Sequence, residues 1–113
     1  MQHSKKLLQK GAKNGRFQDA AHFLKNLAHP VRLSILCELM HRGETSVGEL
    51  VASQKLVSQS QVSQFLAKMK SEGLITSRKE AQFVHYSIKS EAVKKLIQSL
   101  DKIFCTGRRE HQL

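Results

Sequence analysis

Residues 58–73 read SQSQVSQFLAKMKSEG, and the spacing of apolar residues in this stretch decides the fold. The apolar residues that recur there at three- and four-residue intervals are Val62, Phe65, Leu66 and Met69. This period predicts a short helix with one buried face. Ser58 and Gln61 have capping-box spacing, which marks the start of the helix, and Gly73 marks its end.

The opposite face of this helix carries small polar residues and one cation, a composition suited to reading duplex DNA. Its members are Ser60, Gln61, Ser63, Gln64 and Lys68. Glutamine can bond adenine N6 and N7 together, serine can donate or accept, and lysine suits a phosphate. The helix N-terminus adds N–H groups that attract an anion. A polar face is also typical of a helix that merely faces solvent, so the neighbouring elements must decide.

The preceding segments supply the first half of a helix-turn-helix. Ser46 and Glu49 form a second capping-box signature, which predicts a short helix through about Gln54. Before it, apolar periodicity predicts one helix from Phe17, ended by Pro30, and another over residues 30–41.

The following segments predict a hairpin and a terminal helix. Residues 74–79 and 83–88 read as two strands around residues 80–82, a turn that lacks the usual glycine. In such a wing, the side chains placed to meet DNA are Arg78, Lys79, Gln82 and His85. The terminal helix, residues 90–104, carries an apolar seam that favours packing against a second copy of the chain.

Composition agrees with a nucleic-acid partner. The 113 residues include 19 Lys and Arg against 9 Asp and Glu, a formal net charge of +10. There is no Trp and only one Tyr, which disfavours a single-strand binder built on stacked bases.

No membrane-length apolar run or secretory signal is evident, so we expect a cytoplasmic protein with no membrane partner. We expect a flexible basic arm at residues 1–16, one domain at 17–105 and a tail at 106–113.

Several motifs resemble the ArsR/SmtB family of winged-helix regulators. They are residues 27–36 (LAHPVRLSIL), 46–50 (SVGEL), 62–66 (VSQFL) and 72–75 (EGLI). The resemblance implies a mainly α fold of about five helices plus a two-stranded wing. It also implies a homodimer through the first and last helices, bound to an imperfect inverted repeat of double-stranded DNA with recognition helices about 34 Å apart. One departure is that residues 49–58 are one residue longer than the family spacing and lack its turn glycine.

The positions of the two cysteines resemble the BigR, SqrR and HlyU-like branch, most of all its HlyU-like members. In that branch, one cysteine at each place senses reactive sulfur or oxidants, which implies a redox-sensing pair of Cys37 and Cys105 here. From the residues alone, Cys37 falls on an apolar stripe and is equally explained as core packing, whereas Cys105 lies off the stripe of its helix. The two positions are 68 residues apart, so only folding can make them neighbours.

Metal and cofactor sites are not expected. Ser46 and Gly48 occupy the positions where metal-sensing relatives carry cysteines, and the last helix has no histidine. Cys37 and His41 with a distant Cys105 do not form a recognisable zinc set.

The sequence leaves three functions to distinguish. The favoured one is a repressor or derepressor whose DNA binding follows the redox or persulfide state of Cys37 and Cys105. The alternative is a DNA-binding regulator without a thiol input, controlled by abundance or a protein partner. An enzyme is not expected, because the chain has no Cys-x-x-Cys, glycine-rich phosphate loop or paired acids.

Overall fold

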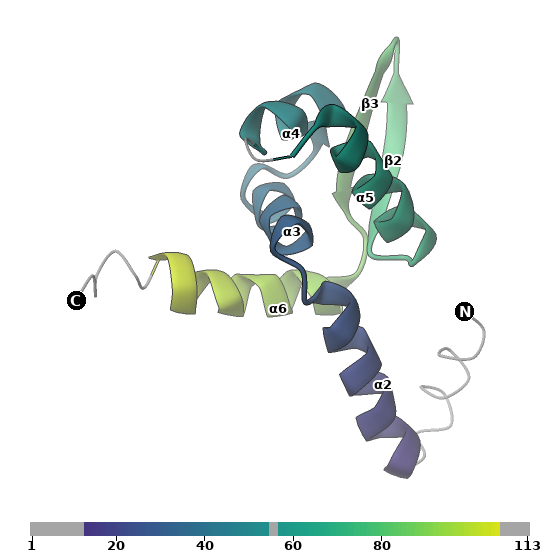
Figure 1. Ribbon diagram of the computed structural model, residues 1–113, viewed down its shortest axis with the longest axis vertical. Coiled ribbons are helices and arrows are strands. Elements are labelled where there is room, and N and C mark those ends of the chain that lie inside the picture. The colour runs from purple at the N-terminus through teal and green to yellow at the C-terminus, as the bar shows by residue number, and fades with distance from the viewer. Residues whose placement is uncertain (1–12, 55–56, 107–113) are drawn as a thin grey trace.

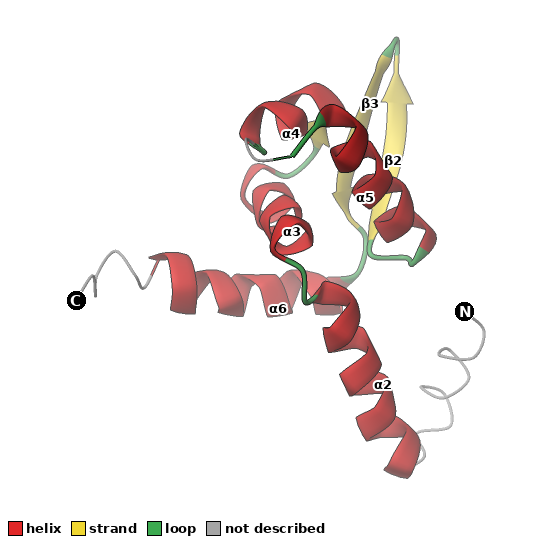
Figure 2. Ribbon diagram, in the orientation of Figure 1, coloured by secondary structure: helices red, strands yellow, loops and turns green. Residues whose placement is uncertain are grey.

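The computed structural model describes residues 13–54 and 57–106, a mainly helical chain with a small antiparallel sheet (Figure 1; Figure 2). The elements in chain order are α2 (Lys13–Leu27), α3 (Pro30–Arg42), β1 (Thr45–Ser46), α4 (Val47–Ser53), α5 (Gln59–Ser71), β2 (Ile75–Glu80), β3 (Phe83–Ile88), α6 (Glu91–Asp101) and the π-helical turn η1 (Lys102–Thr106). This is the winged helix-turn-helix arrangement that the sequence predicted. The predicted arm up to residue 12 and the predicted tail from residue 107 lie outside the described residues.

The hydrophobic core lies where α3, α4 and α5 pack with α6 and the sheet. Its buried apolar side chains are Leu27, Ile35, Leu36, Leu39, Leu50, Val62, Leu66, Met69, Leu74, Ile75, Val93 and Ile97. Three of the four apolar residues of α5 are in this set, as the period predicted, and Phe65 is half buried at its edge. Burial of this one stripe fixes which face of α5 points outward.

Two capping boxes start the helices of the helix-turn-helix, as predicted. The Ser46 hydroxyl accepts from Glu49 N–H at 3.2 Å, and the Glu49 carboxylate accepts from Ser46 N–H at 3.0 Å. Ser58 and Gln61 repeat the pattern at 3.1 and 3.0 Å. Each cap satisfies N–H groups that the helix cannot pair internally, and losing such a serine costs about 1 kcal/mol.

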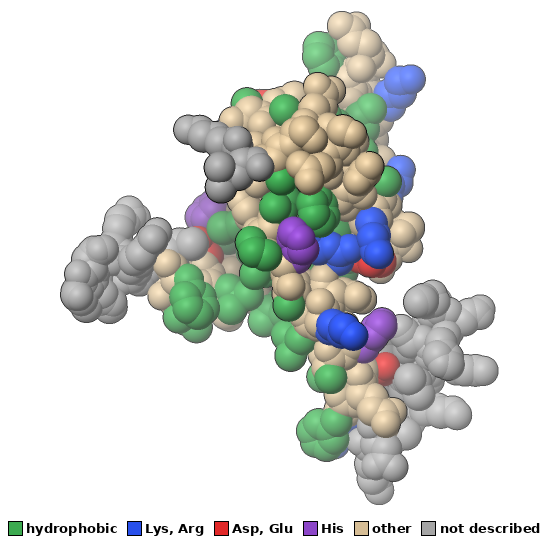
Figure 3. All heavy atoms as spheres, viewed as in Figure 1, with side chains coloured by type: hydrophobic (Ala, Val, Ile, Leu, Met, Phe, Trp, Pro, Cys, Tyr) green, Lys and Arg blue, Asp and Glu red, His purple; other side chains and the backbone are tan. Residues whose placement is uncertain are grey.

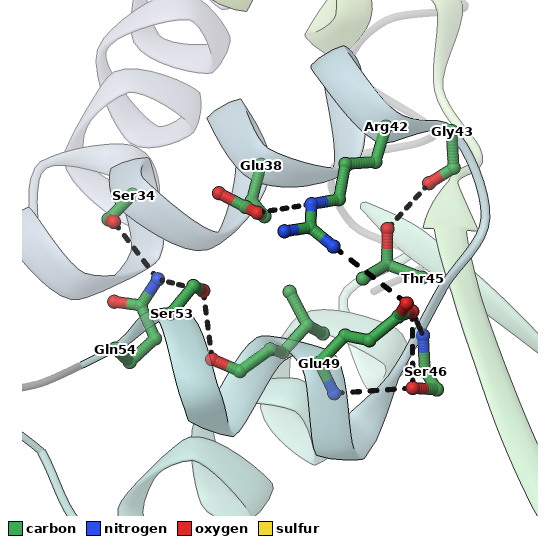
Figure 4. A network of polar contacts seen from close by, with 10 residues as sticks. Ser34, Glu38, Arg42, Gly43, Thr45, Ser46, Glu49, Ser53 and Gln54 are labelled. Atoms are coloured by element: carbon green, nitrogen blue, oxygen red, sulfur yellow. Dashed lines mark hydrogen bonds and ion pairs between the residues drawn. The ribbon is translucent and has the colours of Figure 1, made fainter.

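Polar contacts hold α4 against α3 (Figure 4). Arg42 pairs with Glu38 on its own helix at 2.5 Å and reaches Glu49 on α4 at 3.8 Å. At the other end of α4, the buried Gln54 donates from Nε2 to the Ser34 hydroxyl at 3.0 Å. These contacts link both ends of α4 to α3.

The sheet has three strands in the order β1-β3-β2, one more than the two-stranded wing that was expected. Thr45 pairs with Tyr86, and Ser46 pairs with His85. Thr45 is fully buried and donates its hydroxyl to the Gly43 carbonyl at 3.0 Å. A strand of two residues is too short to show alternation, and its partner lies about 40 positions away in sequence. Sequence periodicity therefore could not reveal it.

The wing turns at Ala81 and the following residue, between the paired Glu80 and Phe83. Ala81 has a φ of 58°, a left-handed conformation that usually favours glycine. The missing glycine noted in the sequence is thus replaced by an alanine in a strained conformation.

Helix α2 extends away from the body of the molecule and begins at Lys13, before the expected Phe17 (Figure 1). Its start carries no apolar signal, because Lys, Asn and Arg side chains tolerate a helix without contributing to a stripe. Among the described residues, no helix combines the length and apolarity required to span a bilayer.

Candidate nucleic-acid interface

Helix α5 presents the polar face that the sequence singled out. The side chains of that face, all exposed, are Ser60, Gln61, Ser63, Gln64 and Lys68. A shallow groove runs along the helix between Gln59 and Ala67, and Gln64 forms part of its wall. In Figure 3 the surface over α4 and the first half of α5 is largely tan, the colour of the backbone and of side chains that are neither hydrophobic, charged nor histidine. Such a surface can approach base edges without placing a carboxylate against phosphate.

Gln61 has a second role that limits its freedom. Its side-chain oxygen accepts from Ser58 N–H, which completes the cap of α5. Only the amide N–H groups of Gln61 remain to face a ligand. Of the two glutamines predicted to read bases, Gln64 is therefore the better placed for a bidentate contact.

Two residues before α3, Lys25 and His29, lie beside the polar face of α5, although neither was among the predicted DNA-binding residues. A second hollow lies beside Gln64 and Lys68 and is also lined by Lys25 and His29. The His29 ring packs on Phe65 of α5 with centroids 4.7 Å apart, and its Nδ1 accepts from Val31 N–H at 3.1 Å. His29 thus caps α3 and contacts α5 at once. Its only sequence signal was its place before Pro30 at a helix start.

The wing carries its predicted cations in two different settings. Lys79 and Gln82 are exposed near the tip. Arg78 instead donates two hydrogen bonds to the Glu44 carboxylate, with Nε–Oε2 and Nη2–Oε1 distances of 2.6 and 2.8 Å. Its Nη2 also lies 3.4 Å from Glu80 Oε1. The hydrogen bond from Arg78 lowers the pKa of the Glu44 carboxyl. Arg78 therefore ties the wing to the loop before β1, and two nearby carboxylates offset its charge toward a phosphate.

His85 lies away from the wing tip. It pairs with Arg78 across the strands, its side chain is mostly buried, and its Nε2 is 3.6 Å from Glu80. On β2, Ser77 accepts a hydrogen bond from Lys70 of α5 at 2.8 Å. Because strand side chains alternate in direction, Lys79 shares the Ser77 face, the face that meets α5. Figure 3 shows basic side chains along this edge of the molecule.

Of the two predicted sensing cysteines, Cys37 lies at the other side of the fold, where α6 crosses α3. Cys37 is half buried, and its Sγ is 3.6 Å from Asp101 Oδ1 near the end of α6. His41, one turn further along α3, is 3.2 Å from the same carboxylate oxygen. Cys105 falls in η1, and its side chain lies outside the described residues. Asp101 is the residue that sequence reasoning missed, since no local pattern links it to α3.

Comparison with known proteins gives a consistent result. Residues 29–77 match the family profile described as bacterial regulatory protein, arsR family. The HTH-type transcriptional regulator YgaV of Escherichia coli is 48% identical, over 78% of this chain and 88% of the relative. The transcriptional activator HlyU of Vibrio cholerae is 44% identical, over 80% of this chain and 82% of the relative. The solved structure of a predicted DNA-binding transcriptional regulator from E. coli is 45% identical, with a TM-score of 0.76 over 80% of this chain and 95% of that one. The solved structure of the transcriptional repressor BigR from Xylella fastidiosa is 33% identical, with a TM-score of 0.74 over 83% of this chain and 91% of that one.

Proposed function

The chain belongs to the ArsR family of bacterial regulatory proteins and is a DNA-binding transcriptional regulator, not an enzyme, and from that premise we propose how it reads and releases DNA. It binds an imperfect inverted repeat as a homodimer, with one α5 in each of two successive major grooves. It acts in the cytoplasm, where bacterial DNA lies.

The observation that carries this proposal is the outward face of α5. Gln64 and Ser63 are exposed and uncharged, and Lys68 lies one turn beyond Gln64. This order places hydrogen-bonding groups against base edges and a cation against the backbone. The exposed Lys79 on the wing supplies a second phosphate contact. The division of labour predicts that α5 sets sequence preference while the lysines set overall affinity.

The proposed homodimer is supported by apolar side chains that one chain leaves in solvent. On α2, Phe17 is 72% exposed and Leu24 is 54% exposed; on η1, Ile103 and Phe104 are 62% and 64% exposed. Phe17 and Leu24 lie on α2, and Ile103 and Phe104 lie in the turn that follows α6. Helices α2 and α6 both project from the body of the molecule (Figure 1). Exposed apolar side chains on projecting helices are typical of an interaction surface, and a second copy of the chain covers them in this proposal.

Control of DNA binding is assigned to the thiols of Cys37 and Cys105. Cys37 contacts Asp101, which precedes Cys105 by four positions, so folding carries the chain segment bearing Cys105 toward Cys37. Peroxide would join the two sulfurs by removing two electrons and two protons, and would itself be reduced to water. The resulting bond would hold the end of α6 against α3. Because α6 belongs to the proposed dimer interface, the spacing of the two α5 helices would change.

The experiment compares DNA binding before and after oxidation. An operator is first selected from random duplexes with the reduced protein. Cys37→Ser and Cys105→Ser should match the wild-type affinity when reduced, and only the wild type should lose affinity after polysulfide or peroxide. A full response in both single variants would contradict the thiol mechanism, and an unresponsive wild type would favour control by abundance or a protein partner. Failure to select any duplex over random competitor at moderate salt would contradict sequence-specific reading itself.

A further inference from the structure

Three metal-ligating side chains of two helices converge in the groove between α3 and α6. Cys37 and His41 are four residues apart on α3, so their side chains leave the same face. Asp101, at the last position of α6, faces both of them. One Sγ, one imidazole nitrogen and one carboxylate oxygen all lie within 4.8 Å of one another.

We propose that Cys37, His41 and Asp101 form a binding site for a divalent transition metal, with Zn²⁺ as the favoured ion. Thiolate and imidazole favour Zn²⁺ over Mg²⁺ or Ca²⁺, which take oxygen ligands. Three protein ligands with a fourth position left to water is a common zinc arrangement. The proposal concerns different chemistry from thiol oxidation and does not depend on it.

The distances suit this ion. With Zn–S and Zn–N bonds of about 2.3 and 2.0 Å, the ligand atoms of a tetrahedral site lie about 3.5 Å apart. Asp101 Oδ1 is already 3.6 Å from Cys37 Sγ and 3.2 Å from His41 Nε2. The sulfur and the imidazole nitrogen are no more than 4.8 Å apart. A rotation of the His41 ring can adjust that separation, because this side chain is 56% exposed.

The net charge of the metal centre and the access of the ion to the groove also fit the proposed site. The Cys37 thiol loses its proton to solvent when the metal–sulfur bond forms, and Zn²⁺ with one thiolate, one carboxylate and a neutral imidazole has no net charge. A neutral centre tolerates the partly apolar groove, whose walls include Leu33, Ile97 and Leu100 beside the three donors. The groove opens to solvent past His41, so an ion can enter.

The site would bridge two helices that sequence places far apart. Cys37 and Asp101 are 64 positions apart, so no local sequence pattern groups Asp101 with Cys37 and His41. Bound metal would fasten the end of α6 to α3 and would occupy the thiolate of Cys37. Two independent signals therefore report binding: the ligand field of the metal and the reactivity of that thiol.

Cobalt titration of the reduced, tag-free chain tests the proposal. Co²⁺ should give a thiolate charge-transfer band and visible bands of tetrahedral intensity at one ion per chain, and Zn²⁺ should displace it. Cys37→Ser should abolish the charge-transfer band, while His41→Ala and Asp101→Asn should weaken binding at least about tenfold. His22→Ala, which removes an exposed histidine of α2, is the matched control and should leave the affinity unchanged.

The outcomes separate the proposed ligand set from others. Absence of a thiolate–cobalt band in the wild type overturns the site. A cobalt affinity that His41→Ala and Asp101→Asn leave unchanged, or a band that disappears in Cys105→Ser, overturns this choice of ligands. Circular dichroism confirms that each variant is folded, and the largely exposed His41 keeps the test valid if the buried Asp101 variant does not fold. In a second readout, Zn²⁺ should slow alkylation of Cys37 in wild type but not in His41→Ala.

Discussion

Arg32 near the start of α3 forms an ion pair with Glu72 at the end of α5, with 3.1 Å between Nη1 and Oε1. The same Nη1 donates to the Asn26 carbonyl of α2 at 2.5 Å. Only 8% of the Arg32 side chain and 21% of the Glu72 side chain are exposed. One guanidinium therefore fixes the end of the proposed recognition helix relative to α2 and α3.

Breaking this pair should destabilise the protein more than breaking an exposed one. Arg32→Leu leaves the Glu72 carboxylate without its partner in a largely buried place. This should lower the free energy of unfolding by about 3 kcal/mol. Adding Glu72→Leu should recover part of the loss, because no unpaired charge remains. Arg42→Leu, which removes an arginine that is 47% exposed, should cost less than about 1 kcal/mol. Urea unfolding of the wild type and these three variants measures the losses, and equal losses for Arg32→Leu and Arg42→Leu would contradict the role of burial.

Gln64 should carry base preference. Gln64→Ala should cost about 1–3 kcal/mol on the selected operator and relax the preference at one base pair. Gln98→Ala, an exposed glutamine on α6, serves as the control and should change neither quantity. Competition binding against single-base operator variants measures both, and an unchanged preference profile would show that another face of the molecule reads the bases.

Lys68 should behave differently, because a phosphate contact is the same in every sequence. Lys68→Ala should weaken operator and random duplex alike and lower the slope of log affinity against log salt by about 1. A salt titration on both duplexes measures this slope. Loss of affinity confined to the operator would instead make Lys68 a base-reading residue.

Local patterns predicted the helices well because their determinants are local. Ser58 and Gln61 cap α5 through bonds spanning three residues, so their spacing in the sequence already contains the geometry. The buried stripe of α5 follows from a period of 3.6 residues in the same way.

Contacts between distant segments were beyond such patterns. The Arg78–Glu44 pair spans 34 positions and the Cys37–Asp101 contact spans 64. Each is created by packing, in the first case by β1 joining the sheet and in the second by α6 crossing α3. Sequence alone therefore identified Arg78 and Cys37 as candidates but not the carboxylates that they contact, and those carboxylates determine how each residue can act.

The Glu44–Arg78 pair should make wing anchoring depend on pH. The folded-state pKa of Glu44 is lowered, chiefly by its hydrogen bond with Arg78. The pair therefore stabilises the fold above the unfolded pKa of the carboxyl, and this contribution is lost as pH falls through the folded pKa. In a carbon-detected NMR titration, Arg78→Ala should raise the pKa of Glu44 toward the usual value for glutamate. Lys79→Ala, which removes the neighbouring wing cation, should leave it lowered; an equal rise in both variants would indicate a general charge effect instead.

The proposed dimer interface makes a prediction with a closely matched control. Leu24 on α2 and Phe83 on the wing are 54% and 55% exposed, so a glutamate at either position removes a similar exposed apolar surface. If α2 belongs to the dimer interface, Leu24→Glu buries a charge between subunits and should shift the chain toward monomer at micromolar concentration. Phe83→Glu should leave the dimer intact, because the wing points away from α2 (Figure 1). Sedimentation equilibrium measures both, and a wild type that is monomeric, or a Leu24→Glu variant that stays dimeric, would remove α2 from the interface. Because the two α5 helices must span successive grooves together, the monomeric variant should also lose operator preference while keeping the weak, salt-sensitive affinity of one lysine-bearing surface.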